Sequence, residues 1–177
     1  MRGGDKLLEP VEGVPVLRLL CQRGLAAELS VRVCVPALDH VRAQALADLP
    51  VERIAVPLWR TGMSASVRAG LRALDAPSVL ILPADMPEIT EGDLRVIARH
   101  PGRIVQATAE DGTPGHPVRF DRAYFEELRA LTGDTGGRAV LQAHPAEVQR
   151  VTLPACHATT DLDTPEAWAD WRARTSK

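Results

Sequence analysis

The apolar run from Val79 to Leu82 contains no polar residue and ends abruptly at Pro83. Such a run predicts a strand buried on both faces, in a sheet that helices cover on both sides. Asp85 follows two residues after the proline. Ligands of open α/β sheets bind beyond the carboxyl ends of the strands, where an acid can hold a metal ion against a phosphate. Simple capping of the turn would explain Asp85 equally well.

Strands and helices alternate along most of the remaining chain. The pattern predicts a loop over 2–13, helices over 14–28, 37–47, 61–74, 90–100, 121–131, 138–143 and 167–172, and strands over 31–35, 53–56, 103–108, 116–120 and 147–153. This alternation indicates an α/β layered domain with a largely parallel sheet.

Local signals mark several helix starts. Thr90 with Asp93 predicts a capping box, and Thr164 before Pro165 predicts an N-cap followed by a proline in the first helical turn. Ser64 or Ser66 is the expected N-cap of the helix over 61–74. The same glycine-then-serine entry would offer N–H groups to an anion, although plain capping alone accounts for the serines.

Composition narrows the class of protein. The length of 177 residues fits one domain over 1–177. The net charge of −2 argues against a nucleic-acid binder, which needs a basic face. The sequence has no apolar stretch long enough to predict a membrane span. Its N-terminus lacks the apolar core of a signal peptide, and its three scattered cysteines favour reduced thiols in the cytoplasm.

Three segments supply residues suited to phosphate chemistry. Of the 21 basic residues only Lys6 and Lys177 are lysines, and an ammonium on a flexible stem suits a phosphate. Lys6, Asp85 and either Asp161 or Asp163 would be the minimum set for Mg²⁺-assisted transfer at a phosphate. An acid such as Asp163 is more often just a favourable charge near a helix N-terminus, and a histidine before a proline, as at His116, is more often structural.

Six segments, in order, resemble the motifs of the MobA-like nucleotidyltransferases, and the match covers nearly the whole chain. They are Gly4–Pro10 with Gly13–Leu17, Gly62–Ser66 with Gly70–Leu71, Leu82–Pro87, Gly115–Val118, Gly133–Arg138 and Asp161–Pro165. Within this family, the start at Lys6 and the Met63–Ser66 segment look most like the molybdenum cofactor cytidylyltransferases.

The resemblance implies a Rossmann-like three-layer α/β/α sandwich and a cytoplasmic transferase of molybdenum cofactor biosynthesis. It implies that CMP passes from CTP to the phosphate of a molybdopterin-type cofactor with Mg²⁺, releasing pyrophosphate, and that a molybdoenzyme receives the product. The implied roles, by residue, are catalysis for Lys6 and Asp85, nucleotide binding for Lys6, Gly62, Ser64 and Ser66, acceptor binding for Gly115, His116, Pro117, Asp134 and Gly136, and metal binding for Asp85 with Asp163 or Asp161.

One departure from the family motif concerns the beginning of the chain. The family begins with a buried central strand and a glycine-rich loop, whereas this sequence begins near the end of that loop. We therefore expect an N-terminally truncated domain whose sheet lacks its first central strand, together with most of the glycine-rich loop whose N–H groups hold phosphate. Two alternatives stay open: a catalytically impaired domain that binds and delivers the cofactor, and a nucleotidyltransferase that acts on a sugar phosphate.

Overall fold

The computed structural model describes residues 5–175, so the first three residues of the loop expected over 2–13 lie outside the described part. The helices are α1 (Val16–Ala26), α2 (Val41–Gln44), α3 (Met63–Gly70), α4 (Glu91–Arg99), α5 (Phe125–Arg129), α6 (Arg138–Ala143) and α7 (Pro165–Thr175), with single 3₁₀ turns η1 (Lys6–Leu8), η2 (Trp59–Thr61), η3 (Arg122–Tyr124) and η4 (Pro145–Glu147). The strands are β1 (Pro10–Val11), β2 (Val14–Pro15), β3 (Arg32–Val35), β4 (Glu52–Ala55), β5 (Ser78–Ile81), β6 (Ile104–Thr108), β7 (Pro114–Asp121) and β8 (Val148–Thr152).

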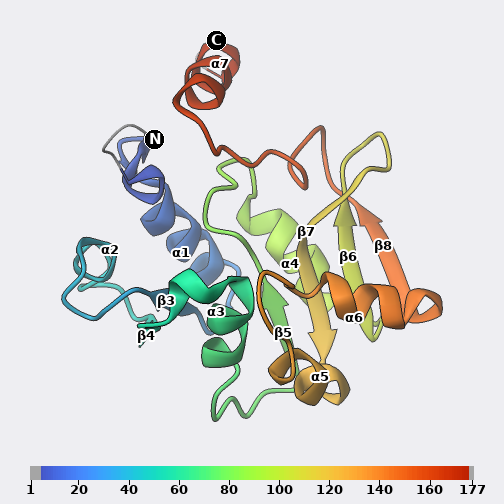
Figure 1. Ribbon diagram of the computed structural model, residues 1–177. Helices are drawn as coiled ribbons and strands as arrows, with labels where there is room; N and C mark the ends of the chain where they lie inside the picture. The colour runs from blue at the N-terminus through green and yellow to red at the C-terminus, as the bar shows by residue number, and fades with distance from the viewer. Residues whose placement is uncertain (1–4, 176–177) are drawn as a thin grey trace.

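A four-stranded sheet in the order β5-β7-β6-β8 forms the middle of the molecule (Figure 1). Strands β5, β6 and β8 point the same way, because β6 is parallel to β8 and both β5 and β6 are antiparallel to β7. Strands β3 and β4 form a separate parallel pair. Three of the four strands therefore run in one direction, and the reversed strand β7 makes the β5–β7 and β6–β7 pairs antiparallel.

Helices cover both faces of this sheet, which gives three layers. Along β5, Leu80 packs with α1, α4 and α7 in one apolar cluster, while Val79 and Ile81 pack with α3, α5 and α6 in another. Figure 1 shows α4 behind the sheet and α5 and α6 in front of it. Alternate side chains of one strand thus enter two cores, as expected for a Rossmann-like α/β fold.

Strand β5, which precedes Asp85, is less buried than its sequence predicts. Residues 78–82 are half-buried, so the expected complete burial on both faces is wrong. Within the described residues β5 pairs with β7 alone, which leaves its other edge without a ladder partner. The expectation of an N-terminally truncated domain stays a prediction.

The N-terminal segment is more ordered than a loop. Residues 5–13 contain η1 and the first strand of a β1–β2 hairpin, which turns at Glu12 and Gly13, both with positive φ. Because Pro15 pairs with Pro10 in this hairpin, helix α1 begins at Val16 and not at residue 14.

The expected helix over 37–47 is reduced to the four residues of α2. After α2 the backbone bonds are of the tighter i→i+3 type, such as Leu46 N–H to the Ala43 carbonyl. Arginine side chains also take these carbonyls: Arg53 donates to Ala43 and Arg18 donates to Ala45. Side-chain donors therefore compete with continuation of the helix.

The capping predictions had mixed outcomes. Both halves of the capping box of Thr90 and Asp93 are present, and the Thr164 hydroxyl accepts from the N–H of Ala167. The prediction of Ser64 or Ser66 as the N-cap of α3 is wrong, because Gly62 holds that position with φ of 121°. None of the helices in the described residues is long and apolar enough to cross a membrane.

Candidate active site

The structure brings Lys6, Asp85 and Asp163 together. The ammonium of Lys6 donates to Oδ2 of Asp85 at 2.5 Å and to Oδ1 of Asp163, which lie 79 and 157 residues further along the chain. Asp85 has a side chain only 13% exposed, whereas that of Asp163 is 68% exposed. Burial lowers the pKa of Lys6, but its hydrogen bonds to the two carboxylates outweigh this effect and hold the pKa above its ordinary value.

Apolar packing places these three residues. Leu7, next to Lys6, and Ala84, next to Asp85, both pack against one cluster that includes Leu17 of α1 and Val35 of β3. The segment before α7 is fixed by its backbone, because the N–H of Leu162 donates to the carbonyl of Asp85. Asp163 is therefore held beside Asp85 by the backbone of its neighbour.

The two candidate second ligands are thereby distinguished by position. Both acids are exposed, but only Asp163 has a described contact with Lys6. The charge of Asp161 acts instead on His116. Burial lowers the pKa of His116, and the charges of Asp85 and Asp161 oppose that effect only in part. His116 is thus close to the acidic cluster and favoured as a neutral imidazole.

The expected acceptor segment 115–117 packs against the chain just before Asp161. The N–H of His116 donates to the carbonyl of Ala158 at 2.8 Å. A Cβ on Gly115 would lie 1.8 Å from the same carbonyl oxygen, so a larger residue would displace the strand. Pro117 is buried behind them. This segment therefore borders the acidic cluster.

The other expected acceptor segment, the turn over 133–137, contacts the expected nucleotide segment instead. The N–H of Ser64 donates to the carbonyl of Gly133, and a Cβ on Gly136 would lie 2.6 Å from the sulfur of Met63. Asp134 is exposed on the turn. Ser64 is buried and uses its N–H within the protein, whereas Ser66 is half-buried.

The sequence analysis missed two residues that support Lys6. The carboxylate of Asp5 accepts hydrogen bonds from Nε and Nη2 of Arg42 at 2.7 and 2.9 Å. It also accepts the N–H of Leu7 and so caps η1. Asp5 could have been noticed from its position beside Lys6. Arg42 has no local signal, since it lies 37 residues away.

The donor set of the cluster fits a hard divalent cation. Two carboxylates already share one cation, the Lys6 ammonium, and Mg²⁺ is commonly held by one or two carboxylates with substrate phosphates completing its shell. Among the described residues no group of three or more His, Cys, Asp or Glu side chains is arranged to hold a metal alone. A metal here would therefore take further ligand oxygens from water or from a substrate.

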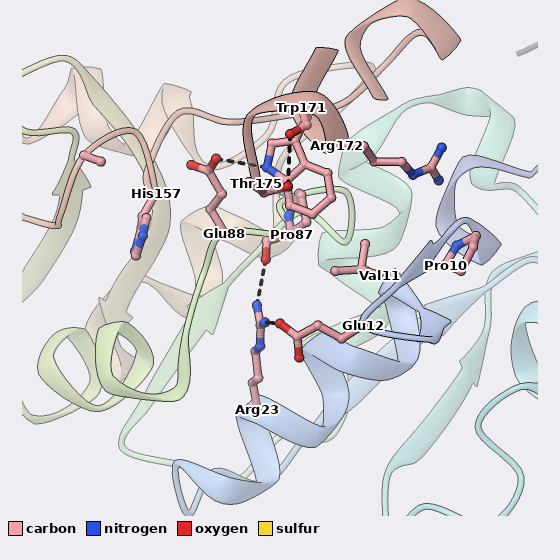
Figure 2. Close-up of a pocket in the computed structure, with 11 residues that line it drawn as sticks. Pro10, Val11, Glu12, Arg23, Pro87, Glu88, His157, Trp171, Arg172 and Thr175 are labelled. Atoms are coloured by element: carbon pink, nitrogen blue, oxygen red, sulfur yellow. Dashed lines mark hydrogen bonds and ion pairs between the residues drawn. The ribbon is translucent and has the colours of Figure 1, made fainter. Parts of the chain in front are cut away.

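A separate concavity of about 540 Å³ lies between α1, the β1–β2 hairpin and α7 (Figure 2). Its charged side chains are paired within the protein. Arg23 donates to Glu12 and to the Pro87 carbonyl, and Trp171 Nε1 donates to Glu88 at 2.9 Å. The Trp171–Glu88 contact docks α7 against the loop after Asp85, and the Arg23 contacts join α1 to the same loop and to the hairpin.

Comparisons with known proteins identify the family of the chain and its fold. The family model for the MobA-like NTP transferase domain matches residues 1–148. No curated protein matches the chain.

Several solved structures are similar in fold. The structure of Rv0371c from Mycobacterium tuberculosis is 24% identical, with a TM-score of 0.82 over 99% of this chain and 90% of that one. The same protein in complex with manganese is 23% identical, with a TM-score of 0.80 over 99% of this chain and 94% of that one.

More distant structures have the same fold. The nucleotidyl transferase Mth528 from Methanothermobacter is 19% identical, with a TM-score of 0.79 over 96% of this chain and 84% of that one. The CMP:2-keto-3-deoxy-manno-octonic acid synthetase complexed with CTP is 13% identical, with a TM-score of 0.72 over 97% and 91%. The family model spans well over half of the sequence, and the chain therefore belongs to the MobA-like NTP transferase family and is a nucleotidyltransferase.

Proposed function

We propose that this protein transfers CMP from CTP to the phosphate of a molybdopterin-type acceptor and releases pyrophosphate. The observation that carries the proposal is the convergence of Lys6 on Asp85 and Asp163. An ammonium and two carboxylates at one point can hold both a polyphosphate and its cation, and transfer at a phosphate depends mainly on such positioning.

The reaction needs no nucleophile from the protein. An ionised oxygen of the acceptor phosphate attacks the α-phosphorus of CTP. The bond from that phosphorus to the oxygen bridging the β-phosphate breaks, and pyrophosphate leaves with the bonding electrons. Lys6 contacts the β- and γ-phosphates and offsets the charge that develops on the departing group.

Asp85 and Asp163 are the residues that would hold Mg²⁺. When bound, the metal would neutralise phosphate oxygens of the nucleotide and polarise the reacting phosphate. The manganese complex of Rv0371c, a protein of similar fold, supports a divalent cation. The half-buried position of Asp85 supports its role as the more firmly held of the two ligands.

The choice of nucleotide and acceptor rests on resemblance. Gly62, Ser64 and Ser66 would lie by the nucleotide, and the structural neighbour that is complexed with CTP supports cytidine. The acceptor would face Gly115, His116 and Pro117, with Asp134 and Gly136 on the turn over 133–137. Three free cysteines support a cytoplasmic location. The recipient of the product would be a molybdoenzyme, which rests on the resemblance alone. Because that neighbour is named for a sugar acid, a sugar phosphate is the second acceptor to test.

The decisive variant is Asp85→Asn, which keeps the shape of the side chain and removes its charge. We expect transfer to fall by about 100-fold or more, because the ligand to the metal and the partner of Lys6 are both lost. Pyrophosphate release and CMP incorporation would be measured, with circular dichroism to show that the fold is kept. Asp75→Asn is the matched control, since Asp75 is 88% exposed and pairs only with Arg122 among the described residues.

The substrates are separated by a panel of CTP, GTP, ATP and UTP against molybdopterin and sugar phosphates. Transfer to molybdopterin from CTP supports the proposal, and transfer only to a sugar phosphate replaces the acceptor. Capture of a molybdoenzyme without Mg²⁺-dependent CTP binding would favour a cofactor-binding and delivery domain, whereas tight CTP binding would count against it. Unchanged turnover in Asp85→Asn would contradict the assignment of Asp85.

A further inference from the structure

The Lys6 side chain projects from a turn that has little support of its own. Turn η1 has three residues, and none of them is buried. A single 3₁₀ turn is marginal without tertiary contacts. The position of the Lys6 ammonium over Asp85 and Asp163 therefore depends on what anchors this turn.

The anchor is the carboxylate of Asp5. One of its oxygens caps the turn by accepting the N–H of Leu7 at 3.1 Å. The two oxygens together accept the Nε and Nη2 donors of Arg42, a bidentate pair in which both side chains are largely buried, at 19% and 23% exposed. Bidentate arginine–carboxylate pairs fix geometry as well as adding energy. Burial raises the pKa of Asp5, but the bonds from Arg42 and Leu7 outweigh it and hold the pKa below its usual value.

Arg42 belongs to a different part of the molecule from Lys6. It lies on α2, which follows β3, and its helix neighbour Ala43 is fully buried in the apolar cluster against which Leu7 packs. A rigid guanidinium on a packed element thus reaches across to the capping carboxylate of a weakly supported turn.

We propose that Arg42 is a positioning residue, which through Asp5 fixes the Lys6 ammonium where the phosphates of the nucleotide bind. This role rests on the proposed function, because it needs a polyphosphate for Lys6 to contact. Arg42 itself touches neither Lys6 nor the two acids in the described hydrogen bonds, so its action is indirect.

The chain offers a matched control pair. Arg18 on α1 makes a similar bidentate contact with Asp48 through Nη1 and Nη2, at 2.6 and 2.7 Å, and its side chain is exposed to the same extent as that of Arg42, 22% against 23%, although Asp48 is more exposed than Asp5. Arg18 and Asp48 make no described contact with η1 or the acidic cluster. Arg42→Gln and Arg18→Gln therefore remove the same chemistry at two places.

The first test compares the affinity of each variant for CTP with its affinity for cytidine. We expect Arg42→Gln to weaken CTP binding about tenfold or more and to leave cytidine binding unchanged, because only the phosphates meet Lys6. Arg18→Gln should alter neither affinity. Equal loss for CTP and cytidine, or equal behaviour of the two variants, would overturn the proposal.

A double-mutant cycle tests the indirect route. If Arg42 acts only through Lys6, adding Arg42→Gln to Lys6→Gln should weaken CTP binding no further. Additive losses would show that Arg42 acts on the nucleotide by another route, which contradicts the proposal. Asp5→Asn, which keeps a capping oxygen, and Arg42→Lys, which keeps the charge, provide milder variants if Arg42→Gln does not fold.

A third readout needs no nucleotide and so separates this inference from the proposed function. The chain has two lysines, Lys6 and Lys177, and mild acylation followed by mass spectrometry gives the ratio of their modification. We expect the Lys6 share to rise severalfold in Arg42→Gln and to stay unchanged in Arg18→Gln. An unchanged Lys6 share overturns the positioning role, whereas a raised share in a protein that binds no nucleotide would count against the proposed function alone.

Discussion

At the scale of single residues, the contact with Lys6 distinguishes Asp163 from Asp161 as the second candidate metal ligand, a choice that the sequence left open. Asp161 and Asp163 both precede α7 and both are exposed, but only Asp163 has a described contact with Lys6. Buried Leu162 lies between the two acids, and its N–H donates to the carbonyl of Asp85, so the chain is fixed at the point that separates them. The two acids therefore differ in their contact with Lys6, and variants of each can test whether they also differ in metal binding.

We predict that Asp163→Asn weakens Mn²⁺ binding in the presence of CTP by about tenfold or more, because one of two charged ligands is lost. Asp161→Asn is the matched control and should bind Mn²⁺ like the unaltered protein. Electron paramagnetic resonance of free Mn²⁺ measures both affinities. The reverse order of effects would move the second metal ligand to Asp161.

How well the site could be predicted depended on the range of the interactions. Lys6 and Asp85 stood out because each is unusual in its own segment, a rare lysine and an acid after an apolar strand. Arg42 did not stand out, because the chain has 21 basic and 23 acidic residues. Nothing in its own segment indicates that Asp5 is its partner. Long-range pairing depends on the fold, which composition and spacing do not encode.

At the scale of elements, the start of α3 and the turn over 133–137 form one packed unit. Gly62 has φ of 121°, and a Cβ on it would lie 2.3 Å from the carbonyl oxygen of Gly133. On the other side of the turn, a Cβ on Gly137 would lie 2.9 Å from the ring of Phe120. The turn is thus held between α3 and the core, and it cannot shift without moving α3.

We predict that Gly62→Ala lowers the free energy of unfolding by about 3 kcal/mol or more, since backbone strain and a clash with backbone combine. Gly112→Ala is the control, because Gly112 also has positive φ, 85°, but has open space around it. Its cost should be about 1 kcal/mol, from strain alone. Urea denaturation measures both, and equal losses would show that the contact with Gly133 adds nothing.

Local capping signals predicted helix starts well where the cap comes from the chain itself. Thr90 and Thr164 cap their own helices through hydroxyls a few residues away. At α3 the serines failed as caps, because the Gly133 carbonyl, 69 residues beyond Ser64 along the chain by their numbering, accepts the Ser64 N–H at 3.2 Å. A helix start that depends on a distant turn has no signature in its own segment.

At the scale of the whole molecule, Tyr124 reports on the packing of the apolar cluster between the sheet and helices α3, α5 and α6. Tyr124 is the only tyrosine in the chain, is buried, and donates its hydroxyl to Glu147 at 2.6 Å. Burial, followed by this hydrogen bond, raises the pKa of Tyr124 to about 12. The protonated phenol is therefore the form that the fold favours.

We predict that phenolate absorbance appears near pH 12 in the folded protein, and not near the ordinary value of about 10. Because the pKa is raised on folding, this stabilisation is complete below about pH 10 and is lost as the pH rises to about 12. Ultraviolet titration with circular dichroism, and urea denaturation across this range, measure both effects. Tyr124→Phe should abolish the phenolate signal, and a transition near pH 10 in folded protein would contradict the prediction.

The contact of Lys6 with Asp163 also has a consequence for synthesis on the ribosome. The two residues are 157 positions apart, so a growing chain makes Lys6 and Asp85 long before Asp163. Domains can begin to fold as they emerge. A nascent chain can therefore pair Lys6 with Asp85 early. Asp163 is added only after translation has passed β8, the last strand of the sheet. A product released before that point would contain Asp85 but not Asp163.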